Sequence, residues 1–151
     1  MRTARSGTPC SQSITPHLDD NSCGVIVLSK VILVISHDSV TALQRHLAEA
    51  MGVEVHWEKS GLGDRLPMAL RSQYLVKVAS LLGHQCAFLI RTGGDEVSAE
   101  TIAKHLAVVR GKWSDAIVMV ADRITPHVRR RLIAERIPFI IPGTQVSLPF
   151  L

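Results

Sequence analysis

The sequence feature that most constrains the fold is a strand–helix–strand pattern within residues 113–149. Residues 116–120 form an apolar run of the length of a buried parallel strand, and Thr125-Pro126 then supplies an N-cap and a first helical residue with a preset backbone angle. The helix is predicted to end at Ile137-Pro138, before a second apolar run at residues 139–141. Because parallel strands need a crossover connection, this pattern predicts one βαβ unit.

The surface of that helix is strongly basic. Val128, Leu132 and Ile133 share its predicted apolar face, which should pack on the core. The remaining surface carries His127 and five arginines: Arg123, Arg129, Arg130, Arg131 and Arg136. Such a surface can contact nucleic-acid phosphates without reading the base sequence. It can also be a solvated helix face whose arginines pair with Glu135 and other acidic neighbours, and the charge pattern favours this second interpretation.

The other patterns extend this unit into an alternating α/β domain. Apolar or β-branched runs predict strands at residues 25–35, 53–57, 87–90 and 145–148. Helical spacing of apolar residues predicts three more helices, over residues 38–51, 67–82 and 98–110, each followed by a glycine. Strands that alternate with helices predict the α/β class, with a mostly parallel sheet, helices on both faces and a three-layer α/β/α arrangement.

Length and composition agree with one such domain. The chain has 151 residues, of which 46% are hydrophobic and only 4% aromatic, and a core of aliphatic side chains suits a sheet that is covered on both faces. Residues 1–22 are rich in Ser, Thr and Pro and have no hydrophobic period, so we expect a flexible lead followed by a single domain over residues 23–151. The net charge of +4 permits contact with nucleic acid without requiring it.

The cysteines and the amino-terminal residues bear on localisation. Cys10, Cys23 and Cys86 are odd in number and lack the spacing of a zinc site, and Cys86 is expected to be a small core residue. Neither a signal peptide nor an apolar run of membrane-spanning length is visible. We therefore expect a cytoplasmic protein with no bound metal, no cofactor and no membrane partner.

Glycine-rich loops give only weak indications of a nucleotide site. Gly61-Leu62-Gly63 lacks the third glycine of a dinucleotide-binding loop. Gly93-Gly94 is followed by Asp95 and Glu96, whose carboxylates would repel phosphate. Both pairs are interpreted as ordinary loop glycines.

A metal-dependent nuclease of the PD-(D/E)xK kind is a second possibility. Its chemistry needs carboxylates and a lysine on neighbouring strands, where they hold a divalent cation and position the attacking water. In this chain the candidates for such a site are Asp38, Glu58 and Lys59, in a distorted arrangement. Glu58 and Lys59 are adjacent, so in a strand their side chains would point to opposite faces. No complete catalytic set is therefore predicted, and a degenerate nuclease or another small α/β enzyme remains the alternative.

The carboxyl-terminal half resembles a known bacterial group. The resemblance rests on LPMALR at residues 66–71, on LLG at residues 81–83, on RRLI at residues 130–133 and above all on IPFIIPGTQVSLPFL at residues 137–151. These segments are similar to the N-terminal α/β domain of proteins labelled MarR-family or winged-helix transcriptional regulators, a restriction-endonuclease-like group. Members of that group continue into a helix-turn-helix module, which the resemblance implies would bind DNA. This chain ends at Leu151, so no DNA-reading residue can be carried over.

The sequence thus supports a functional hypothesis that depends mainly on the resemblance. It describes a non-catalytic sensory or interaction domain of a bacterial transcriptional regulator, self-associating into a homo-oligomer. DNA would be contacted weakly through the basic helix, or through a separate helix-turn-helix module. The five arginines named above are the candidate nucleic-acid-binding residues.

Overall fold

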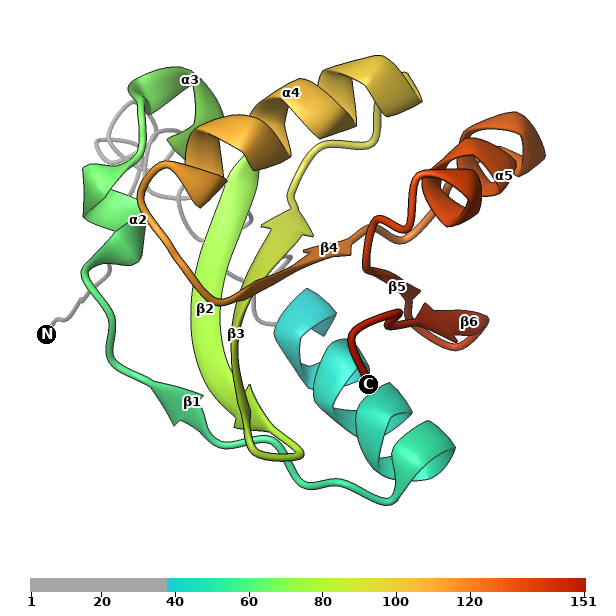
Figure 1. Ribbon diagram of the computed structural model, residues 1–151. Helices are drawn as coiled ribbons and strands as arrows, with labels where there is room; N and C mark the ends of the chain where they lie inside the picture. Colours follow the sequence, from blue (N-terminus) through green and yellow to red (C-terminus); the bar gives the residue numbers. More distant parts are fainter. Residues whose placement is uncertain (1–37) are drawn as a thin grey trace, which may run out of the picture. The chain divides into compact units, whose positions relative to one another are not determined.

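A computed structural model describes residues 38–151 of the chain, and a six-stranded sheet runs through this part. The strands lie across the sheet in chain order, from β1 to β6 (Figure 1). Their bounds are Trp57–Glu58 for β1, Tyr74–Leu81 for β2, His84–Arg91 for β3, Ala116–Val120 for β4, Phe139–Ile141 for β5 and Gln145–Ser147 for β6. The predicted lead over residues 1–22, the start of the predicted domain and the predicted strand at residues 25–35 lie outside the described residues.

Helices connect several of these strands. Residues 38–51 are helical, and they precede α2 (Leu62–Arg65), α3 (Met68–Arg71), α4 (Ala99–Arg110) and α5 (Pro126–Ala134). Helix α4 connects β3 to β4 and α5 connects β4 to β5, and both strand pairs are parallel, as the strand–helix–strand pattern predicts. The bounds of β4 and β5 match the two predicted apolar runs. None of the helices in residues 38–151 is long and apolar enough to span a lipid bilayer.

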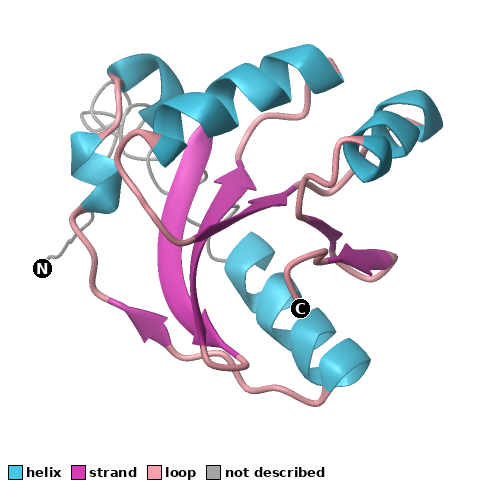
Figure 2. Cartoon of the chain, in the orientation of Figure 1, coloured by secondary structure: helices cyan, strands magenta, loops and turns pink. Residues whose placement is uncertain are grey.

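The prediction of a mostly parallel, three-layer sheet is wrong. Three of the five strand pairings are antiparallel, namely β1 with β2, β2 with β3 and β5 with β6. The sheet is therefore mixed, and within the described residues only the helix over residues 38–51 packs on its second face. The error arises at residues 74–82, which were expected to be helical and instead form β2 and the start of a hairpin turn (Figure 2).

A tight turn joins β2 to β3. Only Leu82 and Gly83 separate the two strands, and their φ angles are 50° and 86°. Two positive φ values in a two-residue loop match the type I′ turn, whose twist fits that of an antiparallel pair. The flanking residues Leu81 and His84 pair directly. Gly83, expected to stop a helix, instead turns the chain back on itself.

The sequence of β2 has an apolar spacing that also fits a helix, because both faces of the strand are covered. Tyr74 packs in one hydrophobic cluster and Val78 in a smaller one on the same face, whereas Ala79 and Leu81 pack in the cluster on the opposite face. When both faces of a strand are apolar, the alternation that reveals a strand disappears. The apolar spacing of Tyr74, Val78 and Leu81 then fits a helix equally well. Only the first turn after Pro67 is helical, as α3.

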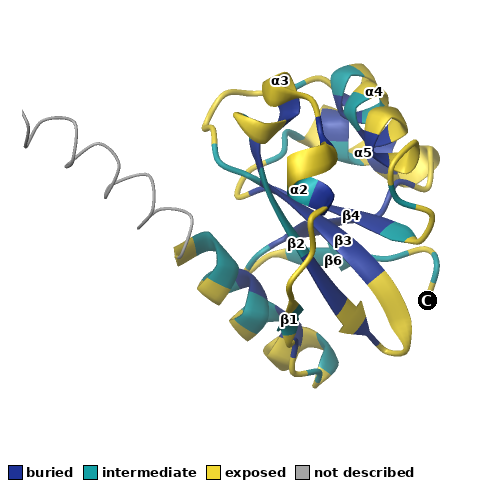
Figure 3. Cartoon of the chain, turned by 90° about the vertical axis from the view of Figure 1, so that its left-hand side faces the viewer, coloured by how far each residue is buried: buried dark blue, intermediate teal, exposed yellow. Residues whose placement is uncertain are grey.

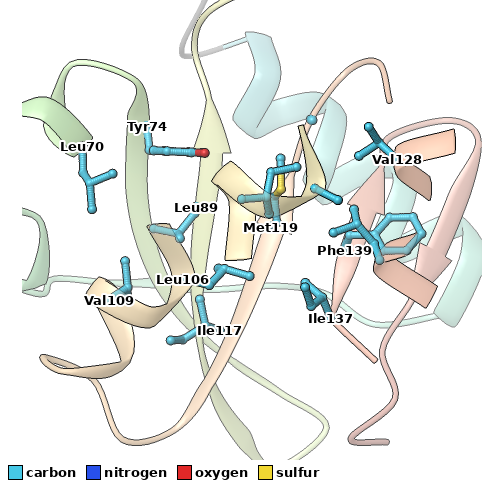
Figure 4. Packing of buried hydrophobic residues seen from close by; sticks show 14 of the residues in the cluster. Leu70, Tyr74, Leu89, Leu106, Val109, Ile117, Met119, Val128, Ile137 and Phe139 are labelled. Atoms are coloured by element: carbon cyan, nitrogen blue, oxygen red, sulfur yellow. The ribbon is translucent and has the colours of Figure 1, made fainter. Parts of the chain in front are cut away.

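The central strands divide their side chains between two clusters, as period-two alternation requires. In β4, Ile117 and Met119 lie in the cluster beneath α3, α4 and α5, and Val118 and Val120 lie in the cluster that contains the helix over residues 38–51. Figure 4 shows the first of these clusters. Figure 3 shows that β3 and β4 are largely buried and β2 partly so, while exposed residues lie on the helices and at the tip of the β2–β3 hairpin.

The predicted helix faces are mostly confirmed. Leu43 and Leu47 of the helix over residues 38–51 are fully buried, and Gly52 follows that helix with a φ of 68°. In α4 the side chain of Ser98 accepts a hydrogen bond from the Thr101 amide at 3.2 Å, which is the predicted cap. One expectation for α5 is wrong: Ile133, placed on its apolar face, is 48% exposed.

The hairpin turn predicts an asymmetric effect of two glycine substitutions. Nothing lies within 4 Å of a Cβ built at Gly83 or at Gly61, but Gly83 has a φ of 86° and Gly61 a φ of −81°. We expect Gly83→Ala to lower the free energy of unfolding by about 1–2 kcal/mol, the cost of left-handed backbone for a residue with a Cβ. Gly61→Ala is the matched control and should change it by less than about 1 kcal/mol. Urea denaturation measures both, and equal effects would contradict the assigned turn.

Candidate functional site

A cleft opens at the carboxyl ends of the adjacent parallel strands β3 and β4. It has a volume of about 220 Å³ and its lining includes Arg91, Val97, Met119, Arg123, Thr125 and Val128. A second hollow of about 170 Å³ shares Arg91, Gly94, Asp95 and Arg123 with it. In open sheets, ligands bind outside the carboxyl ends of parallel strands, so this is the first place to consider for a site.

The local sequence explains why the cleft lies there. Arg91 is the last residue of β3, and the next residue, Thr92, is fixed through its amide and hydroxyl to the Gln73 carbonyl at 3.0 and 3.2 Å. On the neighbouring strand, the Ala121 amide donates to the Ile140 carbonyl at 3.2 Å, which extends the ladder between β4 and β5. The loops that lead from β3 to α4 and from β4 to α5 therefore both begin at hydrogen-bonded backbone, at the same end of the two parallel strands.

Two residues that line the cleft, Arg91 and Thr125, each have a buried side-chain polar atom without a partner in the described part of the chain. Nε of Arg91 and Oγ1 of Thr125 are shielded from solvent and make no hydrogen bond within residues 38–151. Thr125 is the residue that precedes α5, yet its hydroxyl does not cap that helix, unlike that of Ser98 before α4. A buried polar atom without a partner calls for an explanation, and a ligand is one such explanation.

Charged groups of both signs surround the cleft. Arg91 is half-buried, whereas Arg123, Asp95, Glu96 and Asp122 are exposed. The ion pairs found in residues 38–151 join Lys104 to Glu100 and Arg131 to Glu135, and neither reaches the cleft. Arg91 therefore makes no ion pair with a carboxylate of residues 38–151.

Arg91 instead lies beside a partly buried hydrogen-bonded pair. It is the register partner of Tyr74 on β2, and the Tyr74 hydroxyl shares a hydrogen bond of 2.9 Å with Nδ1 of His105 on α4. Burial raises the pKa of Tyr74 and lowers the pKa of His105, and the positive charge of Arg91 adds to the lowering for His105. Both groups are thus held in their neutral forms near the cleft.

The basic helix is less uniform than its sequence suggests. Arg131 pairs with Glu135 at 2.9 Å, as the solvated-face interpretation expects, and Arg129 donates to Oε1 of Gln145 at 3.3 Å. Arg130 donates to the Pro126 carbonyl at 3.3 Å. The last two arginines lie in different hollows, since Arg123 lines the cleft and Arg136 lines a separate depression beside Pro138 and Phe150.

The residues of the nuclease alternative lie apart from this cleft. Glu58 is on the edge strand β1, where its carboxylate accepts a hydrogen bond from the Gln85 amide at 3.2 Å, and Lys59 follows it. Asp38 is in the helix over residues 38–51. Neither β2 nor β3 contains an Asp or Glu, and residues 38–151 contain no group of three or more His, Cys, Asp or Glu side chains that could hold a metal ion.

Cys86 is a buried core residue. It belongs to the hydrophobic cluster beside the helix over residues 38–51. Burial, with a smaller effect from the Asp115 carboxylate, raises the pKa of its thiol to about 11. A thiol with this pKa remains protonated at neutral pH, which disfavours nucleophilic chemistry.

Comparison with known proteins does not extend this picture. No protein-family model, no curated protein and no solved structure matches the chain. The resemblance to MarR-like regulators therefore stays a prediction.

Sequence reasoning missed the cleft and its central residue. Gly93-Gly94 was considered for phosphate binding and interpreted as an ordinary loop, and Arg91 was not singled out. The available signal was an arginine at the end of an apolar strand, followed by two glycines, with a second polar loop at residues 122–123 after the next strand. That signal acquires meaning only once β3 and β4 are known to be parallel neighbours.

The Tyr74–His105 pair predicts a pH dependence of stability. Because the pKa of His105 is lowered on folding, the unfolded chain takes up this proton more readily, and stability should fall as the pH drops through the ordinary value of about 6.5. We expect His105→Gln to lose less stability than the unmodified chain between about pH 7.5 and pH 5. His127→Gln, at an exposed histidine, is the control. Thermal unfolding across this range measures the effect, and identical pH profiles for all three proteins would contradict it.

Proposed function

We propose that this chain acts as a non-catalytic sensory and interaction domain of a bacterial, cytoplasmic transcriptional regulator of the MarR-like group. The observation that carries the proposal is the cleft at the ends of β3 and β4. It combines an apolar floor with a few convergent polar groups, which is the usual composition of a small-molecule site. The resemblance of the carboxyl-terminal segments supplies the regulatory context.

The position of the cleft gives a route from ligand to response. Thr125 and Val128 lie at the start of α5, and Val97 and Ile102 lie at the start of α4, and all of them line the cleft. A ligand there would touch both helices, which also contact each other. Because α5 carries Arg129, Arg130 and Arg131, a shift of this helix on ligand binding would move the basic surface.

The proposed contact with DNA is electrostatic. Arg123, Arg129, Arg130, Arg131 and Arg136 would approach backbone phosphates and supply affinity without sequence selectivity, while a separate helix-turn-helix module would read the bases. Self-association into a homo-oligomer would present this surface more than once. The nuclease alternative has weaker support, because the inner strands β2, β3 and β4 carry no carboxylate.

A DNA titration tests the regulatory part of the proposal. We expect weak binding of a fluorescent duplex that weakens steeply as salt increases, with the DNA left intact on a gel with or without magnesium. The triple variant Arg129→Gln, Arg130→Gln, Arg131→Gln should reduce the salt slope by about 1 for each phosphate that is no longer neutralised. Arg65→Gln with Arg71→Gln, at exposed arginines of α2 and α3, is the control. Magnesium-dependent cleavage would overturn the non-catalytic assignment.

A fragment screen tests the sensory part. With isotope-labelled full-length chain and a library of small neutral and charged fragments, we expect amide shifts to concentrate at residues 91–97 and 119–128. The reason is that a concave apolar site binds small molecules better than the flat surface around it. Fragments that shift other regions instead, or no binding by any fragment, would refute a sensory role for the cleft.

A further inference from the structure

We propose that the cleft between β3 and β4 selects a small monocarboxylate with an apolar body, whose carboxylate is held by Arg91 and Thr125. This inference rests on the proposed sensory function and adds the chemical class of the ligand. It is carried by three features of the cleft: its apolar floor, its unpartnered polar atoms and the distribution of charge with depth.

The floor of the cleft is apolar and preformed. Ile102, Met119 and Val128 are at most 5% exposed and belong to the hydrophobic cluster beneath α3, α4 and α5, with Val97 and Ile124 packed against it. Figure 4 labels Met119 and Val128 among the residues of this cluster. Side chains in such a cluster are held by their neighbours, so the floor does not have to be ordered when a ligand binds. A cavity of about 220 Å³ is smaller than the pockets of drug-sized ligands and suits a short branched aliphatic chain or a single ring.

The polar end of the cleft matches a carboxylate. A guanidinium presents its N–H donors in a planar fork that fits the two oxygens of a carboxylate. Arg91 is half-buried with no carboxylate partner in residues 38–151, and its Nε makes no hydrogen bond there. The Thr125 hydroxyl on the same cleft is likewise unpartnered. A ligand carboxylate would accept hydrogen bonds from the guanidinium of Arg91 and, once the Thr125 side chain turns toward the cleft, from its hydroxyl. It would also offset the desolvation of Arg91.

The distribution of charge favours a single negative charge on the ligand. The half-buried charge is the Arg91 cation, whereas the carboxylates of Asp95, Glu96 and Asp122 are exposed at the rim. A partly buried charge interacts more strongly with a ligand than solvated charges do, so the arginine decides the sign of the ligand. Repulsion from the rim carboxylates grows with the charge of the ligand, which selects a monocarboxylate over a phosphate.

Three probes separate the chemical classes. We propose to titrate the full-length chain with isocaproate, with the neutral isostere isocaproamide and with inorganic phosphate, following the amides of residues 91–97 and 119–128. We expect isocaproate to bind about tenfold or more tightly than the amide, as a charge-assisted hydrogen bond implies, and phosphate to leave these amides unshifted.

Variants assign this preference to particular residues. Arg91→Gln should abolish the preference for the acid over the amide, and Thr125→Val should weaken isocaproate binding about threefold to tenfold through loss of one hydrogen bond. Arg71→Gln, at an exposed arginine of α3, should change neither affinity. If Arg91→Gln does not fold, the comparison of acid with amide on the unmodified chain and the Thr125→Val variant still decide the question.

The outcomes distinguish the inference from the function on which it rests. Equal binding of the acid and the amide at the cleft would overturn the carboxylate class and leave a sensory cleft in place. Tighter binding of phosphate than of isocaproate would also overturn the carboxylate class and leave the sensory function in place. The same conclusion would follow if neither isocaproate nor isocaproamide bound while other fragments occupied the cleft. Failure of every fragment at the cleft would overturn the proposed function as well.

Discussion

Strand β3 is constrained on all of its sides, and the rest of the described structure depends on it. Its backbone is hydrogen-bonded to β2 in one direction and to β4 in the other. Its side chains from Cys86 to Ile90 are all buried, with Phe88 and Leu89 in different clusters on opposite faces. It is also the strand where antiparallel pairing changes to parallel pairing. Because the parallel side begins here, the carboxyl end of β3 meets that of β4 and the cleft forms between them.

The position of Arg91 follows from the same constraint. The residue lies where the buried strand ends, so its Nε is covered by the protein while the cleft opens beside it. The neighbouring Tyr74 and His105 are neutral and cannot compensate its charge. A cation held in this way interacts with a ligand more strongly than the exposed Arg130 and Arg131 of α5 can. Arg129 and Arg131 are also already engaged, with Gln145 and Glu135.

Sequence patterns predicted correctly those strands and helices whose formation depends on residues close together in the chain. Strands β4 and β5 are short apolar runs between polar loops, and the Ser98 cap marks the start of α4. These three elements could therefore be located from the sequence. Strand β2 could not, because burial of both faces removes the alternation that marks a strand. That single misassigned segment changed the predicted sheet from mixed to mostly parallel. The cleft was missed for a related reason, since its residues come from two loops that only the strand pairing brings together.

The order of the strands has a further consequence for how the chain folds. Each strand pairs with its neighbours in sequence, from β1 to β6, so no pairing skips a strand. The hairpin of β2 and β3 needs only a two-residue loop to close, and each later strand adds to an edge that already exists. Short loops cost little entropy to close, and a low average separation between contacting residues is associated with fast folding. The sheet can therefore grow from the hairpin outward, one strand at a time.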